Sequence, residues 1–471
     1  MFRNYFRTVW RNLTNNKTFS ILNISGLAAG IACSALILLW AEYYATFNHS
    51  ISNLNNIYNV ENTQTYGENT YTFSATPFKV KDALLQQFPG VENASRFNDI
   101  TSTVSLSDKN LSQKGAYADS AFLKMFSLPV IKGNANSPLN DLSQIAISEK
   151  LAKTYFSNED PLNKTLMVDN HPYKVSAVYK DIPENVQFNG IDFLLPYQNF
   201  YNQNKSGDSW GTNYTDTWVQ LNPKANVEAI NLKLKKIVKE NNPESTNELS
   251  LYPLKRMTLY GVFVNGKEDA SLGQIEYVKM FSVVAFIILI IACINFMNLS
   301  TARSEKRAKE IGLRKVLGSP RTDLIVRFLS ESLTVSYIAV VIAVVIVATV
   351  LPAFNTLIGM HLRLNIFSLS HILFLIIIGA VCGLIAGSYP ALYLSSFNPI
   401  RALKKQITKN AGNVSFVRTG LVVVQFAIST IIIIAVILVY QQIQHAKSRD
   451  LGFNKDNVLY VSTTPTLLKG I

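Results

Sequence analysis

The chain has 471 residues, of which 48% are hydrophobic and only 16% are charged. Soluble domains carry roughly 25% charged residues, so this composition excludes a wholly soluble protein. The formal net charge is +13. Such a charge would indicate nucleic-acid binding if the basic residues were clustered on a folded domain. Residues 44–278 instead hold 21 Lys and Arg against 24 Asp and Glu. We therefore expect no nucleic-acid partner.

Five apolar segments run without Asp, Glu, Lys or Arg for about 20 residues, the length that the hydrocarbon core of a bilayer requires. We predict an α-helical integral membrane protein with five transmembrane helices. The segments lie near residues 21–41, 280–300, 332–351, 372–393 and 419–440.

The positive charge flanks these segments. Four Lys and Arg lie in residues 1–20, eight in residues 301–330 and five in residues 396–418, whereas the segment between the third and fourth helices has only Arg363. By the positive-inside rule, the amino terminus and both basic loops are cytoplasmic, and residues 44–278 lie on the other side of the membrane.

The basic amino terminus has a pattern of its own. A cleavable signal peptide is one alternative, but the apolar run exceeds a typical h-region and no small-x-small site follows it. Residues 2–17 place apolar and basic side chains on different faces of a helix, which predicts a helix in the cytoplasmic membrane interface. Ordinary basic flanking sequence is the other alternative. The apolar face holds Phe2, Phe6, Val9 and Leu13, and the basic face holds Arg3, Arg7 and Arg11.

The long segment 44–278 mixes helical and strand periodicity. Asn226 precedes an amphipathic helix as a predicted N-cap, and Ser148 precedes another helix. Residues 173–179 and 217–221 are rich in β-branched and aromatic side chains, which predicts strands. We therefore expect a large α+β extracytoplasmic domain.

Motifs for catalytic or cofactor sites are missing from the sequence. It has no GxxxxGK[ST] loop for ATP phosphates and no GxSxG elbow. Only His49 and His171 fall in the extracytoplasmic domain, which has no cysteine, so a zinc site is not expected. Cys33, Cys293 and Cys382 lie in apolar segments, where we expect buried packing roles. We predict no catalytic, cofactor or metal site in this chain.

Glycines recur at four-residue intervals in two apolar segments, a spacing that allows membrane helices to approach closely. The pattern suits packing within the chain or a dimer interface. The residues are Gly26 and Gly30 in the first segment and Gly379, Gly383 and Gly387 in the fourth.

The most informative stretch is the basic loop over residues 304–320. We predict a short helix that Gly318 ends, after which Ser319 and Pro320 begin the next helix as N-cap and first-turn proline. The alternative is a solvated loop that only fixes topology. The apolar side chains of the short helix are Leu313, Val316 and Leu317.

Two short segments of similar sequence, one after the first apolar segment and one after the fifth, form a weak internal repeat. Residues 56–60 read NIYNV after the first apolar segment, and residues 457–461 read NVLYV after the fifth. Repeated halves are common in transporters, and chance similarity between two short segments is the alternative.

Several motifs occur in a fixed order. Residues 309–318 read KEIGLRKVLG, residues 389–391 read YPA and residues 398–403 read NPIRAL. They resemble the EIGxRxxLG signature and the YPA and PxxAL endings of MacB/FtsX-like ABC transporter permeases. Other parts resemble the start and the periplasmic core domain of the same family. These are residues 10–13, Gly26, residues 147–152, Phe156, residues 173–178 and residues 181–183.

The resemblance implies four parts of the chain. We expect an interfacial helix and transmembrane helix 1 in residues 1–43 and a periplasmic α+β core domain in residues 44–278. An FtsX-like permease domain with transmembrane helices 2–4 and a coupling helix then covers residues 279–403. Residues 404–471 would form a linker, transmembrane helix 5 and the start of a second, incomplete repeat.

The resemblance also implies a permease that works beside a cytoplasmic ABC ATPase. In that scheme the partner uses ATP, this chain binds no cofactor, and the basic loop docks on the ATPase as a coupling helix. The docking residues carried over from the family signature are Glu310, Ile311, Gly312, Arg314, Lys315, Leu317 and Gly318.

Two functions follow from this family, namely extrusion or transport of a substrate and an FtsX-like control of a periplasmic hydrolase or sensor. A membrane-anchored enzyme is a third alternative. The expected location is a bacterial inner membrane, in contact with lipids. Further expected partners are a periplasmic adaptor and a second permease half or a homodimer. Lipoproteins, peptides, macrolide-like compounds and siderophores all remain open as substrates.

Overall fold

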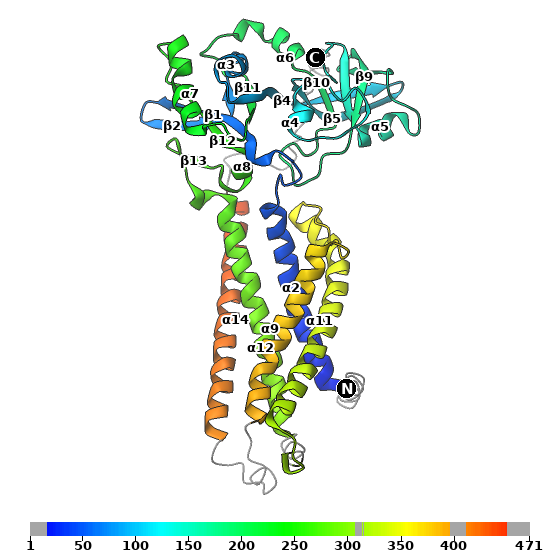
Figure 1. Ribbon diagram of the computed structural model, residues 1–471, viewed down its shortest axis with the longest axis vertical. Coiled ribbons are helices and arrows are strands. Elements are labelled where there is room, and N and C mark those ends of the chain that lie inside the picture. The colour runs from blue at the N-terminus through cyan, green and yellow to red at the C-terminus, as the bar shows by residue number, and fades with distance from the viewer. Residues whose placement is uncertain (1–16, 307–312, 314, 396–410, 450–471) are drawn as a thin grey trace. The chain divides into compact units, whose positions relative to one another are not determined.

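The computed structural model describes residues 17–306, 313, 315–395 and 411–449. The described chain divides into two compact units, shown in Figure 1. The helix unit comprises residues up to Glu42 and from Lys279 onward, and the sheet unit comprises Tyr43–Val278. The predicted interfacial helix and the second copy of the repeat lie outside the described residues.

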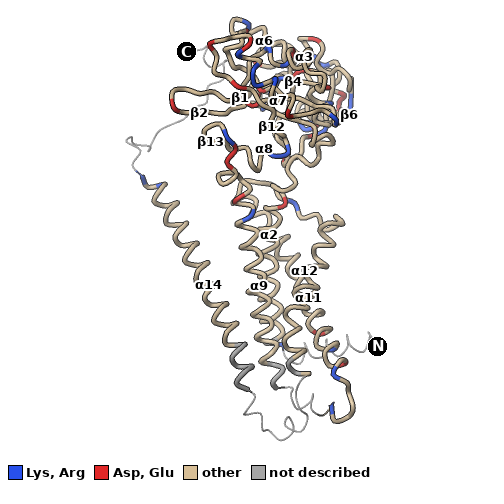
Figure 2. Tube along the Cα trace, turned by 60° about the vertical axis from the view of Figure 1, so that its left-hand side comes forward, with Lys and Arg blue, Asp and Glu red and all other residues tan. Residues whose placement is uncertain are grey.

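The helix unit contains five long apolar helices among its described residues, each long enough to cross a membrane. Charged residues lie near the helix ends, and the middles are almost free of charge (Figure 2). The five predicted transmembrane helices are confirmed. They are α2 (Lys17–Ala45), α9 (Gln274–Lys306), α11 (Arg321–Ile358), α12 (Leu369–Ser395) and α14 (Ala411–Ser448).

Helix α11 begins one residue later than predicted. Pro320 occupies the N-cap position with extended backbone (ψ 156°), and no side chain caps the helix. Ser319 was predicted as the N-cap, and this is wrong because the proline stays outside the first helical turn. At the other end, Gly359 adopts a left-handed conformation (φ 65°), which stops the helix.

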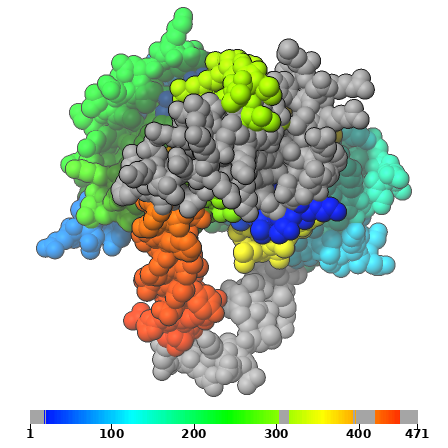
Figure 3. Space-filling model, turned by 90° about the horizontal axis from the view of Figure 1, so that it is seen from below, coloured from blue at the N-terminus to red at the C-terminus, as the bar shows by residue number. Residues whose placement is uncertain are grey.

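Helices α2, α9, α11 and α12 share one hydrophobic core, which includes Cys293 and Cys382. Cys33, which was expected to be buried, is exposed because it lies with Leu22 and Ala29 on the face of α2 that points away from this core. Helix α14 is different, since its described side chains from residue 419 onward are mostly exposed. In the space-filling view α14 lies at the surface (Figure 3).

The sheet unit is built on a twelve-stranded sheet in the order β12-β1-β11-β4-β5-β10-β7-β9-β6, with β2, β3 and β8 branching from it. Most strand pairs are antiparallel, and β5–β10 and β7–β9 are parallel. The strands are β1 (Ile57–Tyr66), β2 (Asn69–Phe73), β3 (Ala75–Thr76), β4 (Val91–Leu106), β5 (Lys109–Ala118), β6 (Val130–Gly133), β7 (Gln144–Ser148), β8 (Thr165–Val168), β9 (His171–Tyr179), β10 (Phe193–Pro196), β11 (Thr215–Leu221) and β12 (Glu248–Pro253).

Short helices and a small hairpin complete the sheet unit. The hairpin pairs β13 with β14. These elements are α3 (Val80–Gln87), α4 (Phe122–Met125), α5 (Glu149–Phe156), α6 (Tyr197–Gln203), α7 (Val227–Asn241), α8 (Leu254–Tyr260), β13 (Phe263–Val264) and β14 (Lys267–Glu268).

Three hydrophobic cores stabilise the sheet unit. One packs α3 and α7 against β1, β11 and β12, and another packs α5 against β7 to β10. The third is aromatic, where Phe188 contacts Phe126 and Trp218 with ring centroids 4.5 and 5.2 Å apart. An α+β domain with its own cores is therefore confirmed.

The local predictions in this unit are also confirmed. Strands β9 and β11 cover the two predicted strand segments. Asn226 caps α7 by accepting a hydrogen bond from the Ala229 amide at 3.0 Å, and Ser148 caps α5 by accepting one from the Leu151 amide at 3.0 Å.

Candidate functional site

The predicted docking loop between α9 and α11 is described only in part. Glu310, Ile311, Gly312 and Arg314 lie outside the described residues, whereas Lys315, Leu317 and Gly318 lie within them. The assignment of all seven residues to ATPase docking therefore stays a prediction.

The described part of the loop is a short helical turn. The amide of Leu317 donates to the Leu313 carbonyl at 3.0 Å, and the amide of Gly318 donates to the Lys315 carbonyl at 3.1 Å. Gly318 has a φ of 92°, which favours glycine and ends the turn. Leu313, Val316 and Leu317 are 53%, 59% and 77% exposed. The loop therefore presents a small apolar surface.

Lys315 contacts the permease itself. Its Nζ donates to the Ser395 carbonyl at 2.6 Å, and Nε of Arg321 donates to Oγ of the same serine at 3.1 Å. Burial, and then the nearby Arg321 cation, lower the pKa of Lys315 from its ordinary value. One basic side chain on each side of Gly318 therefore contacts Ser395, the last described residue of α12.

The three glycines of the fourth segment lie where α12 meets α11. A side chain at any of them would collide with α11, so glycine permits close approach of the two backbones. Oγ of Ser336 also donates to the Gly379 carbonyl at 2.8 Å across this contact. An added Cβ would lie 2.6 Å from Tyr337 at Gly379, 2.9 Å from Leu333 at Gly383 and 2.7 Å from Ser332 at Gly387.

The two glycines of the first segment lie where α2 meets α9. An added Cβ at Gly26 would lie 3.2 Å from Asn295, and one at Gly30 would lie 2.4 Å from Ala292. One turn further along, Oγ of Ser34 donates to the Ala285 carbonyl at 2.9 Å. All five glycines therefore lie at helix contacts within the chain.

A polar contact at the other end of α12 escaped the sequence analysis. Nε2 of His371 lies 3.1 Å from Oε2 of Glu42, and Nδ1 lies 2.9 Å from the Asn365 carbonyl. His371 and Glu42 are more than 300 positions apart, so no sequence pattern could have paired them.

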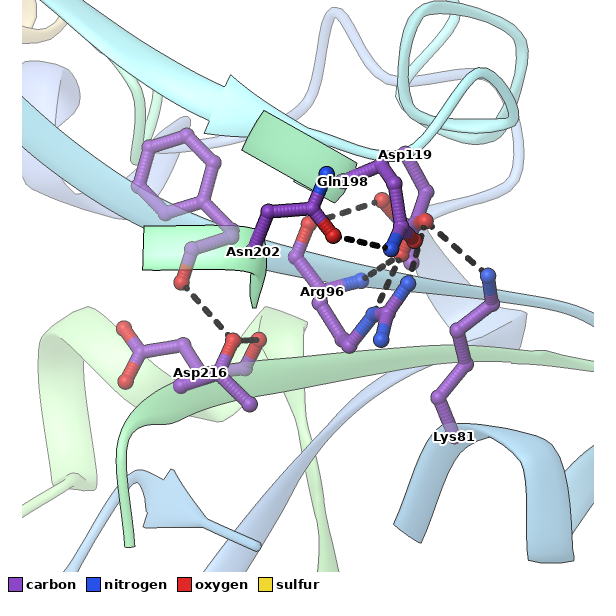
Figure 4. Close-up of polar contacts among 9 residues, drawn as sticks. Lys81, Arg96, Asp119, Gln198, Asn202 and Asp216 are labelled. Carbon is purple, nitrogen blue, oxygen red and sulfur yellow. Dashed lines mark hydrogen bonds and ion pairs between the residues drawn. The ribbon is translucent and has the colours of Figure 1, made fainter. Parts of the chain in front are cut away.

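A charged network joins α3, β4 and the end of β5 in the sheet unit (Figure 4). Arg96 donates from Nε and Nη2 to the two carboxylate oxygens of Asp119, at 3.0 and 2.9 Å, and Lys81 donates to the same carboxylate at 2.9 Å. The Arg96 guanidinium also lies 4.2 Å from the ring centroid of Tyr197. Burial opposes ionisation of Asp119, but the two cations outweigh it and hold its pKa below the ordinary value.

A second group of carboxylates lies on β1 and β11. Glu61 is 4% exposed, and burial followed by the neighbouring Asp216 carboxylate raise its pKa to about 7. Burial and then the Asp99 carboxylate raise the pKa of Asp216 to about 6. These groups change charge near neutral pH, whereas an exposed carboxyl ionises near pH 4.

A polar groove of about 970 Å³ opens between the β1–β2 hairpin, the end of α7 and the β13–β14 turn. Its walls combine threonine hydroxyls with lysine and glutamate side chains from distant segments, which is why sequence analysis missed it. Lys235 and Glu248 form an ion pair of 3.1 Å in this wall. Among the lining residues are Thr63, Thr65, Thr70, Lys235, Lys239 and Glu240.

The described residues contain no cluster of three or more His, Cys, Asp or Glu that could hold a metal ion. Of the two histidines considered at first, His49 is exposed and Nδ1 of His171 lies 3.0 Å from the Asp169 carbonyl.

Five apolar helices with a large sheet unit inserted between the first two define a multi-pass membrane protein with an extracytoplasmic domain. Residues 20–237 match the model of the MacB-like periplasmic core domain, and residues 282–399 match that of the FtsX-like permease C-terminal domain. The chain belongs to the MacB/FtsX-like family of ABC transporter permeases.

Known relatives agree with this family. The chain is 23% identical over 419 residues to the macrolide export ATP-binding/permease protein MacB of Campylobacter jejuni, which covers 85% of this chain and 61% of that protein. It is 22% identical to the uncharacterized ABC transporter permease YknZ of Bacillus subtilis, over 55% of this chain and 60% of that protein. The chain thus spans about three fifths of the length of these relatives.

One solved structure is similar to part of the chain. The periplasmic region of MacB from Actinobacillus actinomycetemcomitans is 15% identical, with a TM-score of 0.34, and covers 43% of this chain and 90% of that structure. Permeases of this family work with a cytoplasmic ATPase. The part of the chain that matches family models consists of the periplasmic and permease domains.

Proposed function

We propose that this chain is the permease subunit of an ABC transporter for substrate extrusion or transport. A separate cytoplasmic ATPase hydrolyses ATP, and the conformational change reaches the sheet unit, which lies in the periplasm. The observation that carries this proposal is that a single chain matches both family models, over residues 20–237 and residues 282–399.

The charge distribution supports the orientation in a bacterial inner membrane. From the basic segments we infer that the amino terminus is cytoplasmic and that residues 44–278 are periplasmic. Cysteine introduced in place of Lys205, in a chain without its three natural cysteines, should react with an impermeant reagent added from the periplasmic side. Labelling only after membrane disruption would place the sheet unit in the cytoplasm and contradict this orientation.

The docking surface for the ATPase combines the predicted loop residues with an exposed apolar side. Leu313, Val316 and Leu317 leave apolar surface uncovered next to the basic residues. Interfaces gather their binding energy in such apolar centres with a charged rim. This surface is the site at which ATP-driven closure would act on the permease.

The test is capture of the cognate cytoplasmic ABC ATPase. Leu317→Glu places a charge in the apolar centre and should weaken capture by at least about tenfold. Gly312→Leu should do the same by adding bulk at the predicted contact. Leu232→Glu is the matched control, since Leu232 is 70% exposed on α7 of the sheet unit. Wild-type capture by both loop variants would reject the docking surface.

A second measurement tests which of the two subunits hydrolyses ATP. The purified chain should hydrolyse no ATP, and adding it to the ATPase should change the turnover of that partner. Hydrolysis by rigorously ATPase-free material would overturn the proposal that this chain is a permease alone.

The FtsX-like match at residues 282–399 also supports a signalling alternative, in which the permease controls a periplasmic hydrolase or sensor. ATPase-dependent loss of a labelled compound from cells would favour extrusion, and ATPase-dependent activation of a hydrolase without such loss would favour signalling. A periplasmic adaptor, and a second permease half or homodimer, belong to the same proposal.

A further inference from the structure

Two basic side chains hold Ser395, the last described residue of α12. Lys315 lies in the loop before α11, and Arg321 is the first residue of α11. Lys315 Nζ donates to its carbonyl at 2.6 Å, and Arg321 Nε donates to its hydroxyl oxygen at 3.1 Å. The hydroxyl in turn donates to the Leu392 carbonyl at 3.0 Å, and Ser395 is 1% exposed. We name this set of three residues, Lys315, Arg321 and Ser395, the α12 clamp.

The clamp consists of charge-assisted hydrogen bonds, since a lysine and an arginine are the donors. Such bonds are stronger than hydrogen bonds between neutral groups. The two cations stand on either side of Gly318, whose left-handed conformation turns the loop back toward α12.

Helix α12 packs closely against α11 through its glycine face. The helix has 27 residues, and at about 1.5 Å per residue it spans the membrane. At its far end, His371 contacts Glu42 of α2, where the chain continues into the sheet unit.

We propose that Lys315 and Arg321 are positioning residues that fasten the ATPase-facing loop to α12, so that displacement of this loop by the ATPase is transmitted along α12 to the opposite end of the helix. This inference rests on the proposed function, because the ATPase supplies the displacement. It assigns Lys315 to a contact inside the permease, and Leu317 remains the residue that faces the ATPase.

The first test needs only the permease. Spin labels replace the exposed Leu317 and Leu392 in a chain whose three cysteines are alanine. Wild type should give one narrow distance distribution. In the double variant Lys315→Met and Arg321→Gln, the fraction of molecules with this narrow distance should fall about tenfold for each hydrogen bond removed. Lys315→Arg retains a donor and should keep the narrow distribution. An unchanged distribution in the double variant would reject the clamp, whatever the ATPase does.

The second test uses the complex with the cognate cytoplasmic ABC ATPase. Spin labels replace Leu369 and Met280, at the far ends of α12 and α9, and the distance is measured with and without ADP and vanadate. The distance is measured on assembled complexes only, and in these the double variant should lose the nucleotide-dependent change. A wild-type change in the double variant would reject transmission through the clamp. Failure of the unmodified chain to capture the ATPase would instead reject the proposed function.

Discussion

Nε2 of His371 lies 3.1 Å from Oε2 of Glu42, so the first turn of α12 is fastened to the last turns of α2. The His371 side chain is 15% exposed and the Glu42 side chain 43% exposed. The other ring nitrogen of His371 lies 2.9 Å from the Asn365 carbonyl, which fixes the orientation of the imidazole. Three segments of the helix unit therefore meet at one histidine.

His371→Gln and Glu42→Gln should each lower stability by only about 1 kcal/mol, since Glu42 is partly solvated. The double variant should lower it by less than the sum of the two single changes, because both remove the same contact. Thermal unfolding of the three variants in detergent measures this coupling. Strictly additive changes would show that the two side chains do not interact.

Gly383→Leu should destabilise the helix unit strongly, because the new Cβ would lie 2.9 Å from the Cα of Leu333, and backbone cannot give way cheaply. We expect a loss of at least about 3 kcal/mol or failure to fold. Gly420→Leu on α14 is the control, since nothing described lies within 4 Å of a Cβ there. Equal unfolding temperatures for the two variants would contradict the close packing of α11 and α12.

Asp119→Ala should destabilise the sheet unit by about 3 kcal/mol, because it leaves Arg96 buried without its carboxylate partner. Asp160→Ala removes the partner of Lys132 in a pair whose side chains are 51% and 63% exposed, and it should change stability by less than about 0.5 kcal/mol. Hydrogen exchange of the β4 and β5 amides in the full chain distinguishes the two variants. Similar protection in both would show that the network contributes little.

The sheet unit should become less stable as pH rises from about 5 to 8. Glu61 and Asp216 hold their protons in the folded state up to pH values of about 7 and 6, whereas the unfolded chain releases them near pH 4. Raised pKa values favour the folded state at low pH. This contribution, about 2 to 3 kcal/mol for the buried Glu61 and less for the partly buried Asp216, is lost through that window. Asp119 acts in the opposite direction only below pH 4, since its pKa is lowered.

Glu61→Gln should flatten this pH dependence and raise stability at pH 8. Hydrogen exchange of the β1 amides at pH 5.5, 6.5 and 7.5, corrected for the intrinsic exchange rate, measures the slope. Glu244→Gln on an exposed loop is the control and should keep the wild-type slope. The same slope in Glu61→Gln would show that this carboxyl is ionised throughout the range.

The sequence predicted what depends on local pattern. Long uncharged segments became helices, and Asn226 became a helix cap, because hydrophobic periodicity and capping act over a few residues. The exposure of Cys33 was missed because an apolar segment does not reveal which face meets lipid. The contacts of Lys315 with Ser395 and of His371 with Glu42 could not be predicted, since they depend on how distant helices align.

The glycine face of α12 also bears on how the protein is made. Because α11 lies directly against the glycine backbone of α12, the contact requires no side chain of α12 to be ordered at these three positions. The two helices follow one another in the chain with only a short connection, so they can pair as soon as both have entered the bilayer. During biogenesis, this helical hairpin would then form without waiting for α2 and α9 to pack against it.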